Sequence, residues 1–301
     1  MADLKLRDLR YLVALADTRH FGRAAAKTFV SQPTLSAQLR KLEEYLGTPL
    51  IERQPNNVTL TPMGERVVER ARRMLNESDE IVALARHSGD PLAGELKVAL
   101  IPTIGPYLLP RVAGKLRKQL PRLKLLLYEY QTGPLLERLK AGELDLGVLA
   151  LPVDTDGFSS RKLYDEPFTV AMPAGHRLAG HKSVKLQELA SEKLLLLEDG
   201  HCLRDQALEV CGKIGLHEND NYRATSLETL RQMVAAGHGI TLLPGLAAAA
   251  AHTDQRALAV RPFTKPAPKR VVGAVWRKST TRAPAIDALC EIVTQTMQHG
   301  P

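Results

Sequence analysis

The chain has 301 residues, of which 44% are hydrophobic and 25% charged, and its formal net charge is +8. The length predicts at least two domains, and the composition is typical of a soluble globular protein, which excludes a disordered or fibrous chain. The positive charge is spread along the whole chain, so it does not by itself identify a nucleic-acid partner. The N-terminus is charged almost at once, and no stretch approaches about 18 uninterrupted apolar residues. We therefore expect no signal peptide, no membrane contact and a cytoplasmic location.

The first sixty residues predict short helices separated by a tight turn. Leu9, Leu12 and Ala16 share one helical face, and "FVSQP" then interrupts a second short helix. Ser31 is a suitable N-cap for a third helix, which tolerates proline in its first turn and ends at Gly47. Two short helices around a tight turn, the second with a polar face, indicate a helix-turn-helix. A plain three-helix bundle with a solvated face is the alternative.

A hairpin and a long helix follow. The stretch "PLIERQPNNVTLTPMG" reads as two short strands around a Pro-Asn-Asn turn, which is a wing with Arg53 at its base. Thr61 then caps a helix that begins at Pro62. Apolar and small residues recur on this helix at heptad spacing, which favours a dimer seam over packing on the chain's own body. The seam comprises Val67, Ala71, Met74, Ser78, Ile81 and Ala85.

From residue 95 onward, strands and helices alternate, which predicts a parallel α/β architecture. Two such sets follow one another, so we expect two Rossmann-like lobes joined by crossover strands, as in periplasmic binding proteins. A ligand site is expected in the cleft between the lobes. The predicted organisation is an all-α winged helix-turn-helix domain over residues 1–61, a dimerisation helix over 62–88 and an α/β regulatory domain over 89–301.

The segment "HCLRDQALEVC" contains two of the three cysteines, Cys202 and Cys211. A zinc site needs about four ligands, and a thioredoxin-type enzyme needs a CxxC motif, which is absent, so neither is favoured. Nine residues along one α-helix correspond to a rise of about 13.5 Å and to opposite faces. A disulfide needs Cα atoms within about 7 Å, so this pair can bond only if the helix unwinds. Two ordinary, semi-buried cysteines remain the alternative.

The surroundings of the two cysteines differ. Cys202 follows "LEDGH" at an expected helix start, where backbone N–H groups and the helix dipole favour a thiolate. His201 and Arg204 can add positive charge or hydrogen bonds, whereas Asp205 opposes them unless it pairs with Arg204. Cys211 lies in a more apolar run. The third cysteine, Cys290, lies on the last amphipathic helix, and we expect it in the core.

The N-terminal motifs resemble a known family. "FGRAAAKTFVSQPTLSAQLRKLEEYLGTPLIER" followed by "VTLTPMG" is similar to the winged helix-turn-helix of LysR-type transcriptional regulators. The resemblance implies that the turn and the third helix face the DNA groove and that the wing holds the backbone. Asn56 stands where the family's wing usually carries a second basic residue. The DNA-binding residues expected on this basis are Arg23, Ser31, Gln32, Pro33, Thr34, Ser36, Gln38, Arg40 and Arg53.

A second resemblance concerns the cysteine segment. "LEDGHCLRDQALEVC" followed by "RATSLETLRQMVAAGHGITLLP" resembles the peroxide-sensing OxyR subgroup of these regulators. It implies that hydrogen peroxide oxidises Cys202 to a sulfenic acid and that Cys211 traps it as a disulfide. The similarity extends to "IPTIGPYLLP" and "EYQTGPLL", which implies that two threonines place peroxide beside the first cysteine. The expected peroxide site comprises Thr103, Thr132, His201, Arg204, Asp205 and Arg270.

These features predict a peroxide-responsive regulator of oxidative-stress genes. We expect it to bind double-stranded promoter DNA as a dimer of dimers and to work with RNA polymerase, without a cofactor or a metal and without enzymatic turnover. One alternative is a LysR-type regulator that senses a small anionic metabolite in the cleft, with incidental cysteines. The other is a thiol peroxidase, which would not need residues 1–88.

Overall fold

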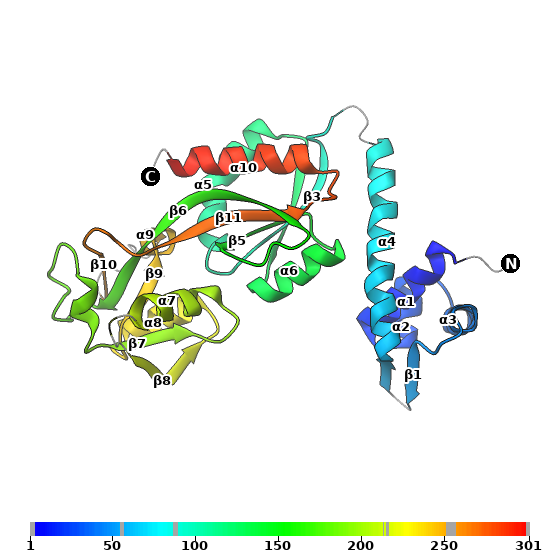
Figure 1. The fold of residues 1–301 in the computed structure, drawn as a ribbon, viewed down its shortest axis with the longest axis horizontal. Coiled ribbons are helices and arrows are strands. Elements are labelled where there is room, and N and C mark those ends of the chain that lie inside the picture. Colours follow the sequence, from blue (N-terminus) through cyan, green and yellow to red (C-terminus); the bar gives the residue numbers. More distant parts are fainter. Residues whose placement is uncertain are drawn as a thin grey trace. The chain divides into compact units, whose positions relative to one another are not determined.

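A computed structural model describes residues 4–54, 57–86, 90–212, 214, 217–250 and 257–298. The chain divides into two compact units (Figure 1): one holds residues 1–89 with 140–143, and the other holds residues 90–139 and 144–301. The junction predicted at residues 88 and 89 lies outside the described residues. Within the described part of the chain, no helix is long and apolar enough to cross a membrane.

The first unit contains the predicted helix-turn-helix and its wing. The hydroxyl of Ser31 accepts a hydrogen bond from the Thr34 N–H at 3.3 Å and caps the third helix, which Gly47 ends at φ +66°. The leucines of the three helices meet in one core in which Leu12, Leu35 and Leu39 are fully buried. The elements are α1 (Leu6–Thr18), α2 (Phe21–Lys27), α3 (Gln32–Leu46) and the antiparallel strands β1 (Ile51–Gln54) and β2 (Asn57–Leu60).

The long helix α4 (Pro62–Arg86) begins where the sequence predicts, because the Thr61 hydroxyl accepts the Gly64 N–H at 2.9 Å. One part of its predicted seam is buried in the chain's own core, and another part is exposed. Ala71 is buried at 1% exposure, and α1 packs against α4, so part of the seam covers the chain's own core. Further along, Met74 and Ile81 are 46% and 66% exposed. The side chain of the last predicted seam residue, at position 85, lies outside the described residues.

The first lobe of the second unit is a sheet covered by helices on both faces (Figure 1). Strand β3 pairs in parallel with both β4 and β5, and α5 and α6 provide the crossovers between these strands. Helix α10 packs against α5, on the opposite face from α6. The elements are β3 (Gly94–Leu100), α5 (Gly105–Gln119), β4 (Leu123–Glu129), α6 (Thr132–Ala141), β5 (Leu146–Leu151), β11 (Lys269–Arg277) and α10 (Ala283–Gln298).

The 16-residue strand β6 (Phe158–Pro173) joins the two lobes. Its first part pairs with β11, and its second part pairs with β9 and β10 in the second lobe. Each lobe has its own hydrophobic cluster, so the two-lobed α/β prediction is confirmed. The second lobe contains η1 (Leu186–Leu189), β7 (Lys193–Leu197), α7 (Cys202–Gly212), β8 (His217–Ala224), α8 (Leu227–Ala235), β9 (Thr241–Pro244), α9 (Gly245–Ala250) and β10 (Leu258–Pro262).

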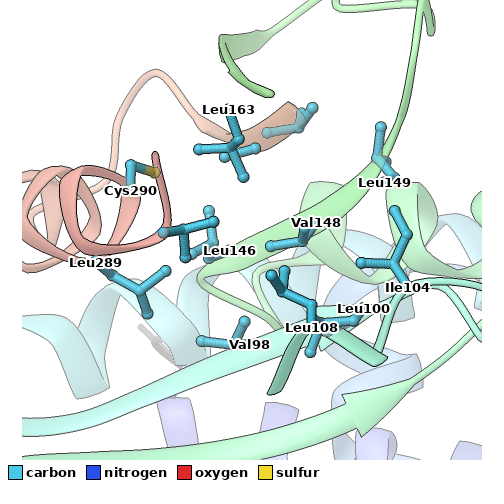
Figure 2. Close-up of a cluster of buried hydrophobic side chains, with 14 of the residues drawn as sticks. Val98, Leu100, Ile104, Leu108, Leu146, Val148, Leu149, Leu163, Leu289 and Cys290 are labelled. Carbon is cyan, nitrogen blue, oxygen red and sulfur yellow. The ribbon is translucent and has the colours of Figure 1, made fainter. Parts of the chain in front are cut away.

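Cys290 belongs to the core of the first lobe (Figure 2). It is fully buried on α10, beside Leu289, and the strand residues Leu146 and Val148 belong to the same cluster. Burial raises the pKa of the Cys290 thiol to about 12, so the thiol stays protonated and acts as a small apolar group.

This packing predicts the effect of two substitutions at Cys290. Cys290→Ala should lower the free energy of unfolding by about 1 kcal/mol, because it leaves only a small void. Cys290→Ser should lower the free energy of unfolding by about 1–3 kcal/mol, because it places a hydroxyl among apolar side chains. Urea unfolding of the reduced full chain measures both. A serine variant as stable as the unchanged protein would contradict the core assignment.

Candidate functional site

The thiol of Cys202 lies where the two lobes meet. Cys202 is the first residue of α7 in the second lobe, yet its side chain packs against the hydrophobic cluster of the first lobe. A backbone hydrogen bond from Ala150, near the carboxyl end of β5, reaches its sulfur. The thiol is partly buried. A movement of one lobe relative to the other would therefore change the surroundings of this thiol.

Cys211 has a different environment on the same helix. It is fully buried in the cluster of the second lobe, and burial raises the pKa of its thiol to about 11. All three cysteines are free thiols. Because α7 is helical from Cys202 to Gly212, the two sulfurs project from opposite sides of one helix, with Cα atoms about 13.5 Å apart along its axis.

Two threonines stand at the same edge of the first-lobe sheet as this thiol. Thr103 follows β3 and Thr132 begins α6 after β4, and the carboxyl ends of these parallel strands meet. Thr103 is buried at 2% exposure. The Thr132 hydroxyl oxygen is buried without an ordinary hydrogen-bond partner among the described residues, and it lies close enough to lower the pKa of Cys202. The edge therefore holds a buried hydroxyl that faces the Cys202 thiol and has no other partner among the described residues.

A buried ion pair supports this edge. Arg270 donates from Nε to Glu166 Oε2 at 2.8 Å, and from its two Nη atoms to the hydroxyl and the carbonyl of Thr103, both at 2.9 Å. Glu166 also accepts the N–H of Leu246, at the start of α9, at 2.8 Å. Both charged side chains are almost fully buried, so their pairing fixes the position of the guanidinium.

Sequence reasoning did not identify Glu166. Its only sequence signal is an acidic residue at the start of the apolar run "EPFTVAM". Its partner Arg270 is 104 positions away, a separation that no local pattern reveals.

The electrostatics of Cys202 differ from the sequence prediction of a favoured thiolate. Burial has the largest effect and raises the pKa of the thiol. The Arg270 guanidinium, the Thr132 hydroxyl and the Ala150 backbone lower this pKa in part, whereas Asp205 raises it. Because the net direction is upward, the resting thiol is protonated at neutral pH, and the helix start does not overcome the loss of water.

The residues around the start of α7 differ in burial and in their partners. Arg204 is 8% exposed and binds Asp199 Oδ1 at 2.9 Å and the Leu197 carbonyl at 3.3 Å, so it pairs with Asp199 and not with Asp205. The side chain of Asp205 is exposed. His201 is buried at 5% exposure, and its carbonyl accepts the Arg204 N–H. Of the expected peroxide-site residues, Thr132 and Arg270 act on the thiol, Thr103 holds Arg270, and Arg204 anchors the first turn of α7.

The expected DNA-binding residues lie on α2, on α3 and at the turn between them. Most of the expected residues on α2, at the turn and on α3 are exposed, while Ser36 and Gln38 are half-buried. The hydroxyl of Ser31 is engaged in the helix cap, and Arg23 donates to the Thr18 carbonyl at 2.9 Å. The backbone of Arg53 lies in β1, but its side chain and Asn56 are outside the described residues. The exposed members are Arg23, Ser31, Gln32, Pro33, Thr34 and Arg40.

The raised pKa predicts how Cys202 titrates. In a Cys211→Ala, Cys290→Ala background, thiolate absorbance at 240 nm should remain below half of its maximum at pH 9.0, the ordinary value for a cysteine. The thiolate should form only as the pH rises further, because its charge is held in a partly buried site. Unfolding in urea should restore the ordinary midpoint. A folded-state midpoint below pH 9.0 would show that Arg270 and the helix start outweigh burial.

A second prediction concerns Glu166. Glu166→Gln leaves the guanidinium of Arg270 without its counter-charge, so the pKa of Cys202 should fall and the thiol should react several-fold faster with peroxide at pH 7. Asp165→Asn is the matched control, because Asp165 is exposed and pairs with Lys162 and Lys269 at the surface. Loss of a buried partner costs about 3–5 kcal/mol, so rates must be compared where both variants are folded. If the pKa of Cys202 is the same in Glu166→Gln as in the unchanged protein, the ion pair does not control the reactivity of the thiol.

Two family models match the chain. The LysR substrate binding domain matches residues 89–298, and the bacterial regulatory helix-turn-helix protein, lysR family, matches residues 6–65. Among curated proteins, the DNA-binding transcriptional dual regulator OxyR of Escherichia coli K12 is 45% identical over 294 residues, which cover 98% of this chain and 96% of that protein.

Solved structures show the same similarity. Full-length OxyR from Pseudomonas aeruginosa, with a cysteine replaced by aspartate, has a TM-score of 0.79 and 41% identity and covers 97% of this chain and 95% of its own. A cysteine-to-serine variant of Corynebacterium glutamicum OxyR, bound to H2O2, has a TM-score of 0.66 and 36% identity and covers 99% and 96%, respectively.

Proposed function

Because the chain belongs to the LysR family of bacterial regulators, in its group of hydrogen peroxide-inducible activators, we propose that it is a peroxide-sensing, DNA-binding transcriptional regulator of oxidative-stress genes. A reversible disulfide between Cys202 and Cys211 is its switch. The observation that carries this proposal is the Cys202 thiol, which is held between two lobes, faces the buried Thr132 hydroxyl and feels the charge of the fixed Arg270 guanidinium. The protein acts in the cytoplasm, where promoter DNA lies, and as a sensor and not as an enzyme.

The first step is oxidation of Cys202. Its sulfur attacks one oxygen of H2O2, the O–O bond breaks, and the thiol proton leaves with the departing hydroxide as water, so that a sulfenic acid remains. The Thr132 hydroxyl can hydrogen-bond to the peroxide, and Arg270 can stabilise the charge that develops on the leaving oxygen. The peroxide bound in the Corynebacterium glutamicum relative supports a peroxide site in this group.

The second step joins the cysteines. The sulfur of Cys211 attacks the sulfenic sulfur, the S–O bond breaks, and water leaves with the thiol proton of Cys211. The Cα atoms must come from about 13.5 Å along a helix to within about 7 Å, so α7 has to unwind. Cys211 must also leave the core of the second lobe. Oxidation therefore rebuilds a segment that contacts both lobes, which is how a small oxidant can change the regulatory domain.

The first unit supplies DNA binding. We place α3 in the major groove, with the β1–β2 wing beside the minor groove. The residues that face DNA are those expected from the family resemblance on α2, α3 and the wing. Two such modules on one pseudo-palindromic site require a dimer, and the exposed apolar residues of α4, Met74 and Ile81, can form its seam.

A tetramer needs a second contact between copies, and the second unit has a candidate surface. An apolar groove of about 390 Å³ runs between α5 and the edge strand β4, where Leu127 is 48% exposed. An uncovered edge strand beside an apolar groove favours association with another chain. We propose that this surface pairs copies into a dimer of dimers, which then works with RNA polymerase at promoters. The groove is lined by Leu109, Pro110, Ala113, Leu116, Arg117, Leu120, Pro121, Leu123, Leu125 and Leu127.

The switch is tested by one oxidation experiment. Reduced protein is treated with about one equivalent of H2O2, its disulfides are mapped by mass spectrometry, and promoter DNA is footprinted before and after. We expect a Cys202–Cys211 bond and an altered footprint, both lost in Cys202→Ser and retained in the matched control Cys290→Ala.

The variants separate the alternatives. Cys211→Ser should accumulate the sulfenic acid of Cys202, which a dimedone probe labels, without forming the intramolecular bond. A full peroxide response in Cys202→Ser would instead favour a regulator that senses a small anion in the cleft. Repeated consumption of peroxide without any change in footprint would favour a thiol peroxidase.

A further inference from the structure

Phe29, in the turn between α2 and α3, combines two unfavourable features. Its side chain is 96% exposed, the highest value among the exposed large hydrophobic residues that the structure describes. Its backbone is in the left-handed region, at φ +57°. Asparagine and glycine favour this region, whereas a bulky aromatic residue is strained there.

The fold of the turn does not depend on this side chain. Backbone hydrogen bonds hold the turn: the Phe29 N–H donates to the Ala26 carbonyl at 3.3 Å and the Val30 N–H to the Ala25 carbonyl at 3.0 Å. The next residue, Val30, packs against the core of the first unit. Asn or Gly at position 29 could make the same turn with less strain and less apolar surface in water, so stability does not explain the phenylalanine.

Its position places it beside the DNA-reading end of α3. Phe29 precedes the N-cap Ser31 by two residues, so the two Cα atoms lie within about 7 Å. Ser31, Gln32 and Thr34 are exposed at that end. When the first turn of α3 enters the major groove, a residue just outside it stands over the edge of the groove, where the sugar-phosphate backbone runs.

We propose that Phe29 packs on the deoxyribose faces of the DNA backbone at the edge of the major groove and so contributes affinity that does not depend on base sequence. This inference rests on the proposed DNA-binding function. A phenyl ring suits this position because the sugar is the apolar part of the backbone, and burial of the ring on DNA removes the apolar surface that is exposed in the free protein. The exposed Ser31, Gln32, Thr34 and Arg40 nearby are polar or cationic and can serve the phosphates and base edges.

The test compares Phe29→Asn and Phe29→Leu in the reduced full-length chain. Binding is measured on a duplex selected by the unchanged protein from a random-sequence pool, and on an unrelated duplex of equal length. We expect Phe29→Asn to bind both duplexes roughly tenfold more weakly, because an apolar contact is lost. The slope of affinity against salt should not change, since no charge is removed. Phe29→Leu should retain most of the affinity.

Stability provides the second readout. Phe29→Asn should raise the Tm by about 2–4 °C, because the new residue tolerates the left-handed backbone. Leu6→Asn, which removes an apolar residue 39% exposed on α1, is the matched control and should not change DNA binding. Unchanged affinity in Phe29→Asn, or a loss confined to the selected duplex, would overturn the backbone contact. A loss of affinity with a lower Tm would assign Phe29 a structural role. If the unchanged protein selects no duplex, the proposed DNA-binding function fails, and this inference fails with it.

Discussion

An α-helix cannot bring together two of its own side chains that are nine positions apart, and the sensing unit depends on this constraint. Cys202 faces the first lobe and Cys211 is buried in the second, both on α7. As long as the helix is intact, its geometry keeps the two thiols apart. A bond between them is therefore compatible only with a different fold of this segment, and chemical oxidation is converted into conformational change without a separate hinge.

The same arrangement limits how readily the thiol reacts. Burial raises the pKa of Cys202, and the nearest fixed cation, Arg270, is already neutralised by Glu166. The resting site is thus a protonated thiol beside a guanidinium whose charge is largely compensated. A protonated thiol is a weaker nucleophile than a thiolate toward any electrophile, and its partial burial limits access of bulky reagents. In the proposed mechanism a small neutral oxidant hydrogen-bonds to the Thr132 hydroxyl, so selectivity would arise from access and from polar groups that are already in place.

Sequence reasoning succeeded where structure is local and failed where it depends on distant partners. The caps at Ser31 and Thr61 and the left-handed Gly47 act within a few residues, so the helices of the first unit could be predicted from their own segments. Thr103 and Thr132 were expected from the family resemblance, and their places after neighbouring parallel strands agree with it. Glu166 was missed, since its role appears only when β6 and β11 pair.

The expectation of a favoured thiolate at the start of α7 was wrong for a physical reason as well. A helix start predicts a stabilised thiolate only if the thiol stays in water, and the packing of Cys202 on the other lobe could not be read from "LEDGHC". The pairing of Arg204 was left open by the sequence, and the fold of the preceding loop brings Asp199 to it. The full length of β6 was also missed, because its first part alternates polar and apolar residues at the surface while only its second part reads as a buried run.

Both proposed sites consist of groups that are unfavourable in the isolated protein. The Thr132 hydroxyl is buried without an ordinary partner, and Phe29 exposes an aromatic ring from a strained backbone. A bulky residue in the left-handed region costs about 1–2 kcal/mol, and the Thr132 hydroxyl has no partner other than the Cys202 thiol among the described residues. Peroxide can give the Thr132 hydroxyl a further hydrogen-bond partner, and DNA can cover the exposed ring of Phe29, whereas the strain of the Phe29 backbone stays. Where a ligand relieves such a cost, the free energy released adds to its affinity, so departures from local preference identify the two sites that we propose.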